Sequence, residues 1–81
     1  MQRHDRMESD LQQVLGRNLR NFREAEELSQ GAFAERMGYH RTHWAAIERG
    51  ERNLTLRSLE RIAAELEIEP LLLLEGPTSR R

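Results

Sequence analysis

The chain has 81 residues, a formal net charge of −1 and no cysteine. This length fits one small domain, and the missing thiols exclude disulfides, thiolate zinc sites and cysteine catalysis. No apolar run approaches the roughly 18 residues of a membrane span, and the polar start has no apolar signal segment. We therefore expect a cytoplasmic protein without membrane association.

The near-neutral total hides an uneven distribution of charge. All 13 basic residues are arginine. Residues 17–23 carry three arginines and no acid, residues 36–52 carry four arginines and two acids, and acids dominate from Glu60 onward until Arg80 and Arg81. Guanidinium groups suit phosphate and guanine, but a host genome rich in G and C also favours arginine. Composition alone leaves both explanations open.

The first ten residues are polar and lack helical periodicity, which predicts a flexible N-terminal arm over residues 1–10 or the frayed start of a helix. A charged arm can reach into a minor groove, although solvated disorder explains the same composition. Spacings of three and four then predict a first helix over about residues 10–26, with Asp10 as its N-cap. Its predicted inner face comprises Leu11, Val14, Leu15, Leu19 and Phe22.

A second helix is predicted to begin after Ser29, a good N-cap. Its inner face would carry Phe33, Ala34 and Met37. Unpaired N–H groups at a helix N-terminus suit a phosphate. Ser29 and Gln30 are therefore candidates for phosphate contacts as well as for simple capping.

Residues 38–50 form the central segment, a short helical run between two glycines. A tight turn over residues 38–40 and a third helix over about residues 41–49, with His40 as its cap, predict a helix-turn-helix motif at about residues 30–49. Trp44 and Ile47 fall on the inner side of that helix. The outer side presents Arg41, Thr42, Ala45, Ala46 and Arg49. Arginine pairs with guanine, threonine bonds base edges and alanine contacts a thymine methyl, so this face predicts base recognition.

The C-terminal part predicts two further helices. Thr55 would cap a helix over about residues 56–67, and Pro70 favours the first turn of another. The inner face of the fourth helix would comprise Leu56, Leu59, Ile62, Ala63 and Leu66. The run of four leucines at 71–74 cannot all face one small core, so we predict a homodimer interface through Leu71, Leu72 and Leu74. A loosely tucked chain end is the alternative, and residues 76–81 are predicted to be a disordered tail.

Taken together, these residues resemble the Cro/repressor-type (XRE, lambda-repressor-like) helix-turn-helix family. The resemblance covers about residues 15–74 and is carried by Leu28-Ser29-Gln30, Phe33-Ala34, Gly38, Ile47-Glu48-Arg49-Gly50, Leu56, Leu59 and Leu66. It implies an all-α fold, a compact five-helix bundle with the DNA-binding domain over residues 11–75. It also implies a transcriptional regulator that binds double-stranded DNA sequence-specifically, as a homodimer on a palindromic operator, and that is associated with the nucleoid when bound.

The resemblance also implies roles for individual residues. The base-facing positions would be Arg41, Thr42, Ala45 and Ala46. The phosphate contacts would be Ser29, Gln30, His40, Arg49, Arg52 and Asn53. Arg23 and Glu48 would form a structural pair between the first and third helices. Gly31 departs from a usually polar, helix-favouring position, and Trp44 replaces a smaller aliphatic residue, so that it either pries the third helix outward or fills a gap.

The segment from His40-Arg41-Thr42 to Glu51-Arg52-Asn53 is similar to the controller proteins of restriction–modification systems, which implies autoregulation. A protein-interaction or antitoxin-type module is the competing interpretation, but the arginines on the outer face of the third helix favour DNA. No catalytic residue is predicted, because His40 and His43 lack further metal ligands and no glycine-rich phosphate loop follows a strand. We expect no metal, cofactor or small-molecule ligand.

Overall fold

The computed structural model describes the backbone of residues 2–76 and the side chains from Leu11 to Gly76. The elements are α1 (Gln2–Ala25), α2 (Gln30–Met37), α3 (Arg41–Glu48), α4 (Leu56–Leu66) and the 3-10 helix η1 (Pro70–Leu74). No strand occurs within residues 2–76, and the predicted all-α fold is confirmed. The fifth element is a five-residue 3-10 helix with a proline in its first turn, in keeping with the short lengths typical of this helix type.

The first helix is longer than predicted. It begins at Gln2, so Asp10 lies inside α1 rather than at its N-cap. Residues 2–15 contain neither glycine nor proline, and most of them are good helix formers, so nothing in the sequence interrupts the helix there. The predicted arm is therefore helical from Gln2 onward. Met1 and residues 77–81, which include most of the predicted disordered tail, lie outside the described residues.

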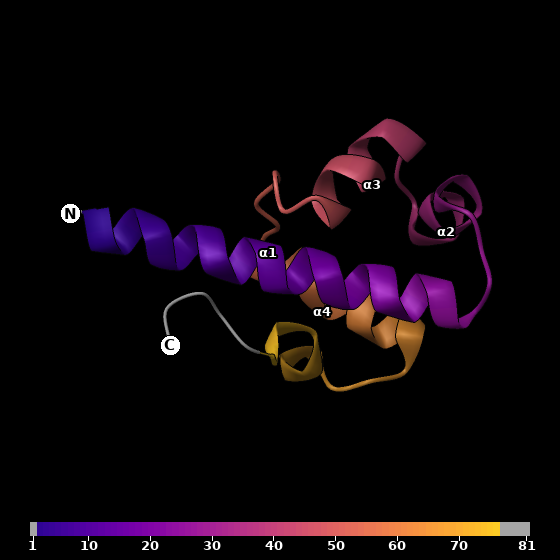
Figure 1. Cartoon of the computed structure of the whole chain (residues 1–81). Coiled ribbons are helices and arrows are strands. Elements are labelled where there is room, and N and C mark those ends of the chain that lie inside the picture. Colours follow the sequence, from indigo (N-terminus) through magenta and orange to yellow (C-terminus); the bar gives the residue numbers. More distant parts are fainter. Residues whose placement is uncertain (1, 77–81) are drawn as a thin grey trace.

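The helices pack in two groups around α1. The pair α2 and α3 lies on one side of α1, whereas η1 lies on another side together with α4 (Figure 1). The side-chain amide of Asn18, in α1, donates to the carbonyl oxygens of Leu73 at 2.9 Å and Glu75 at 2.8 Å. These bonds satisfy backbone acceptors at the end of η1 and hold it against α1.

Aromatic side chains fill the space between α2 and α3. Trp44 is fully buried, with its ring 5.5 Å from that of Phe33 and 5.4 Å from that of Tyr39. The tryptophan thus fills the interior between α2 and α3. The remaining core is aliphatic, and its largest buried members are Leu19, Met37, Ile47, Ile62 and Leu73.

Two of the four predicted helix caps are confirmed. The Ser29 hydroxyl accepts from the N–H of Ala32 at 3.1 Å, and the Thr55 hydroxyl accepts from the N–H of Ser58 at 3.0 Å. His40 occupies the N-cap position of α3, but its side chain makes no capping hydrogen bond. The capping role predicted for the His40 side chain is therefore wrong.

Two leucines assigned to the inner faces are exposed instead. Leu11 is 47% exposed and Leu56 is 77% exposed. Both stand at the beginning of an apolar face, Leu56 as the first residue of α4. Helical spacing places a residue on a side of its helix, but burial also needs a neighbouring element to cover that turn.

Candidate nucleic-acid interface

The outer face of α3 has the composition that the periodicity predicts. Trp44 and Ile47 are buried in the core, whereas Arg41 and Thr42 are exposed. Ala45 and Ala46 are half-buried. The exposed end of α3 is thus its N-terminus, where a guanidinium and a hydroxyl stand beside two small side chains. This arrangement lets the helix backbone approach a DNA groove closely.

Arg41 also differs from most other arginines in its hydrogen bonds and ion pairs. Within the part of the chain whose side chains are described, Arg41, Arg52 and Arg57 have no hydrogen-bond or ion-pair partner. The others are engaged, for example Arg20 with Glu24 and Arg36 with Glu26. Arg41 and Arg52 belong to the predicted DNA contacts. Arg57, in the first turn of α4, is an unpartnered arginine that the sequence pattern did not single out.

Glu48 is the centre of a buried hydrogen-bond network that fixes the other end of α3. Arg23 donates to it twice, from Nε to Oε2 at 2.7 Å and from Nη2 to Oε1 at 3.0 Å. Gln30 donates from Nε2 to Oε1 at 3.0 Å, and Trp44 from Nε1 to Oε2 at 2.7 Å. The pair expected between Arg23 and Glu48 is therefore present. The donors from Gln30 and Trp44 extend it to α2 and to the preceding turn of α3.

The charge state of this carboxylate follows from the same contacts. Burial raises the pKa of Glu48, but the hydrogen bonds from Arg23, Gln30 and Trp44 and the positive charge of Arg23 outweigh it. The pKa of Glu48 therefore lies below its ordinary value. The hydrogen bond to Glu48 likewise raises the pKa of Arg23. Both groups are charged at neutral pH, and the pair joins α1 to α3 as an ion pair with four donor contacts on one carboxylate.

Glycines let the C-terminal end of α3 lie directly on the α1 backbone. A Cβ atom at Gly16 would stand 2.5 Å from the carbonyl oxygens of both Ile47 and Glu48. Gly50 has a φ of +78°, and a Cβ there would stand 2.9 Å from the Gln13 side chain and 3.0 Å from its Cα. Side chains at either position would separate the two helices.

The turn between α2 and α3 is held from α4. The Arg61 guanidinium donates to the carbonyl oxygen of Met37 at 2.8 Å and lies 5.4 Å from the centre of the Tyr39 ring. Tyr39 in turn makes an edge contact with His43 at 5.2 Å. Arg61 therefore satisfies a carbonyl at the end of α2 and packs on the turn at the same time.

The predicted phosphate contacts have different environments in the structure. Ser29 caps α2, and Gln30 is bound to Glu48. Arg49 pairs with the exposed Glu51 at 3.0 Å, which raises the pKa of Arg49. The remaining three are exposed: His40, Arg52 and Asn53. Because the Arg49–Glu51 pair is exposed, solvent screens it, and a phosphate could replace the carboxylate.

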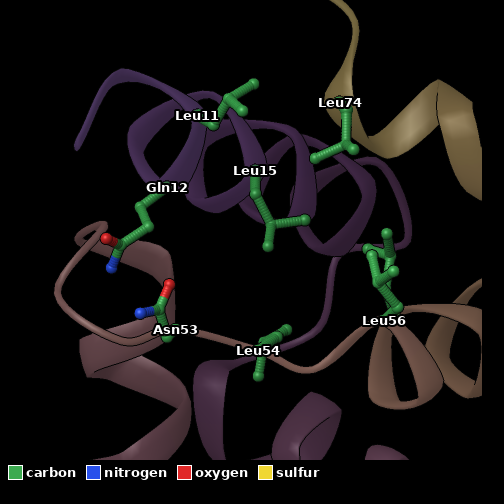
Figure 2. Close-up of a pocket in the computed structure, with 8 residues that line it drawn as sticks. Leu11, Gln12, Leu15, Asn53, Leu54, Leu56 and Leu74 are labelled. Carbon is green, nitrogen blue, oxygen red and sulfur yellow. The ribbon is translucent and has the colours of Figure 1, made fainter. Parts of the chain in front are cut away.

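An apolar groove lies away from α3, where the loop before α4 meets α1 and η1. It has a volume of about 160 Å³, and Figure 2 shows Leu11, Leu15, Leu54, Leu56 and Leu74 facing it. Gln12, Asn53 and Leu59 complete its lining. Next to Leu74 in η1, Leu73 is fully buried, whereas Leu71 is 70% exposed and Leu72 is 44% exposed. The four leucines thus divide between the core, the groove and the outer surface.

Within the described residues, no three potential ligands gather in a way that would hold a metal ion. No described helix is both long and apolar enough to span a membrane.

Comparison with known proteins matches residues 14–73 to a family of helix-turn-helix domains. The chain is 42% identical over 57 residues to control protein C.SmaI of Serratia marcescens, covering 70% of this chain and 68% of that protein. The crystal structure of a hypothetical transcription factor from Neisseria superposes with a TM-score of 0.75 at 38% identity, covering 86% of this chain and 80% of that one. The restriction-modification controller protein C.AhdI from Aeromonas hydrophila gives a TM-score of 0.67 at 37% identity, with coverage of 76% and 90%.

Proposed function

Because the chain belongs to the helix-turn-helix family of DNA-binding transcription regulators, we propose that it reads a palindromic operator as a homodimer. The observation that carries the proposal is the unpartnered Arg41 beside the exposed Thr42 at the N-terminus of α3. A guanidinium that none of the described side chains neutralises is available to a guanine, and a neighbouring hydroxyl to a second base edge. Ala45 and Ala46 permit contact with thymine methyl groups.

Phosphate contacts set the position of α3 in the groove in this proposal. The N-terminus of α2, with Ser29 and Gln30, faces one phosphate. His40, Arg49, Arg52 and Asn53 contact phosphates beside the recognition helix. Gln30 then has two partners, since one of its amide hydrogens already binds Glu48. A phosphate held by Gln30 is thereby linked to the network that fixes α3.

The dimer is proposed to form through the leucine-rich end of the chain. Leu71 and Leu72 are exposed, and the groove beside Leu74 offers apolar walls to a second copy. Exposed leucines next to an apolar groove are a self-complementary surface, as a two-fold interface requires. Two such protomers would present their recognition helices to successive major grooves, about 34 Å apart.

The regulated gene is proposed to be the protein's own operon, as in a restriction–modification system. This part rests on relatives that are named control proteins or restriction-modification controllers. Regulation in this proposal follows from occupancy of the operator. A bound dimer blocks polymerase, or contacts it from an upstream site.

The test is a titration of fluorescent duplex carrying the protein's own upstream promoter, against a scrambled duplex of equal length, at about 150 mM salt. We expect tight binding to the promoter alone. Arg41→Ala should weaken promoter binding by about 1–3 kcal/mol and change scrambled binding little. Arg20→Ala is the matched control, because it removes the same charge from an exposed pair on α1. Equal weak binding to both duplexes would favour a protein-interaction or antitoxin-type module.

The oligomeric state is tested separately by sedimentation. Leu71→Glu places a charge on an exposed side chain, so the fold should remain while the dimer dissociates and binding to the palindrome weakens. Circular dichroism checks that the helices persist. A variant that stays dimeric would place the interface elsewhere on the molecule.

A further inference from the structure

The backbone conformation does not explain why residue 31 is a glycine. It lies in the first turn of α2, where glycine is unfavourable by about 1 kcal/mol relative to alanine. The glycines with positive φ are Gly38, Gly50 and Gly76, and Gly31 is not among them. Any L-residue could therefore adopt the backbone conformation at Gly31. The reason for a glycine here lies in the space that its missing side chain leaves.

The stem of Arg41 borders that space. A Cβ atom at Gly31 would stand 3.4 Å from Cδ and 4.0 Å from Cγ of Arg41. The Oγ of the capping Ser29 is also 4.0 Å away. The methylene groups of Arg41 thus lie across the first turn of α2, beside the proposed phosphate contact. A longer side chain at position 31 would compete with the Arg41 side chain for the surface of this first turn.

The three atoms nearest to a Cβ at Gly31 all belong to side chains, and the nearest two belong to Arg41. At Gly16 a Cβ atom would meet backbone carbonyls at 2.5 Å, whereas at Gly31 the nearest atom belongs to a flexible side chain at 3.4 Å. The Arg41 guanidinium has no hydrogen-bond or ion-pair partner among the described residues. Its direction is therefore set by the packing of its stem, and Gly31 provides the surface against which that stem lies.

We propose that Gly31 is a specificity-determining position that aims the Arg41 guanidinium at its base. Gly31 needs no DNA contact for this role, because it acts through the rotamer of Arg41. The inference rests on the proposed function of Arg41 as a base reader. It predicts that a long side chain at position 31 changes which base pair is preferred opposite Arg41, while the rest of the operator is read as before.

The experiment selects the operator from random duplexes and then measures binding to every single-base variant of it. Wild type, Arg41→Ala, Gly31→Gln and the double variant are compared. The base pair whose preference disappears in Arg41→Ala is the one that Arg41 reads. Ala32→Gln is the matched control, since it adds the same side chain to the next, exposed residue of the same turn. Gly31→Met supplies a second long side chain should the glutamine variant not fold.

In Gly31→Gln we expect the preference at that one base pair to fall about tenfold or more, with other positions and the melting temperature retained. In the Arg41→Ala background the same substitution should have no further effect on preference. Ala32→Gln should leave the preference as in wild type. A uniform loss over all duplexes, an unchanged preference, or an additive effect in the double variant would overturn the inference.

The two proposals fail in different ways. Wild-type protein without any preferred duplex, or with a preference that survives Arg41→Ala, refutes base reading by Arg41 and the inference with it. If Arg41→Ala abolishes the base-pair preference of the wild type but Gly31→Gln retains it, only the role of Gly31 is refuted.

Discussion

The two ends of α3 are built in opposite ways. At the C-terminal end, Glu48 accepts four hydrogen bonds, and the backbone lies on α1 where Gly16 leaves room. At the N-terminal end, His40 makes no capping bond and Arg41 has no polar partner among the described residues. One end is fixed by groups whose hydrogen bonds are satisfied within the protein. The other end keeps its polar groups available for an external partner.

A helix of eight residues can in this way be held in a fixed orientation and still offer side chains for recognition. Interactions that orient a helix need buried, fully satisfied groups. Interactions with a ligand need exposed groups that have not been used. Placing the two kinds at opposite ends lets one short helix have both. Substitutions at the C-terminal end of α3 should therefore reduce stability, whereas substitutions at its N-terminal end should alter recognition.

The largest effect is expected from Glu48→Ala. It leaves the mostly covered Arg23 without its counter-ion and removes the acceptor of Gln30 and Trp44, so the free energy of unfolding should fall by about 3–5 kcal/mol. Urea unfolding followed by circular dichroism measures the loss. Glu51→Ala is the control, because it breaks an exposed pair and should change stability little. Similar losses in both variants would contradict the special role of the buried end.

A smaller loss is expected from Gly16→Ala. The new Cβ would stand 2.5 Å from two carbonyl oxygens of α3, and such overpacking costs about 1–3 kcal/mol. The better helix propensity of alanine offsets about 1 kcal/mol of this. Gly31→Ala is the matched control, since the nearest atom to its Cβ would be in the flexible Arg41 side chain, at 3.4 Å. Thermal unfolding should show Gly16→Ala destabilised and Gly31→Ala equal to or more stable than wild type.

Acid should loosen the end of α3 that Glu48 holds. The pKa of Glu48 is below its ordinary value of 4.5, so the stability that this group contributes is present above that value and is lost as pH falls through the lower folded pKa. Trp44, the single tryptophan, donates to Glu48, so its fluorescence should report the change. In Glu48→Gln the dependence of stability on pH should be flatter in this range. If stability fell with pH in the same way in wild type and in Glu48→Gln, the acid transition would belong to other carboxylates.

The smallest effect is expected at the open end. His40→Ser supplies a hydroxyl at the N-cap of α3, and a new capping bond should add about 0.5–1 kcal/mol to the free energy of unfolding. Because His40 is also a proposed phosphate contact, promoter binding should not improve with stability. Urea midpoints and duplex titrations measure the two quantities. If His40→Ser bound the promoter more tightly in proportion to its gain in stability, fraying at the N-terminus of α3 would limit binding, and a phosphate contact from His40 would be contradicted.

Local sequence patterns predicted most elements of the fold. Spacings of three and four identified the buried faces of α2 and α3, and Ser29 and Thr55 marked helix starts because a side-chain cap acts within its own turn. Predictions of burial were less accurate where burial requires another element to cover the side chain. Leu11 and Leu56 are exposed although their spacing fits an inner face. The start of α1 also differed, because low apolar periodicity does not itself stop a helix.

The partners of the site residues came from contacts between helices. The sequence resemblance paired Arg23 with Glu48, but nothing in it placed Gln30 and Trp44 on the same carboxylate. Gly16 is a point of close approach between α1 and α3, which no local pattern in the sequence indicates. The split of Leu71, Leu73 and Leu74 among surface, core and groove also depends on where η1 lies against α1.

The helices, the helix-turn-helix family and the polar face of α3 follow from periodicity and from residue chemistry within one or two turns, and the sequence is enough to predict them. How the helices pack sets which polar groups are bound within the protein and which of the described ones remain available. That distinction depends on distances between residues far apart in the chain, such as Arg23 to Glu48 and Gly31 to Arg41. Helical spacing carries no information about such distances.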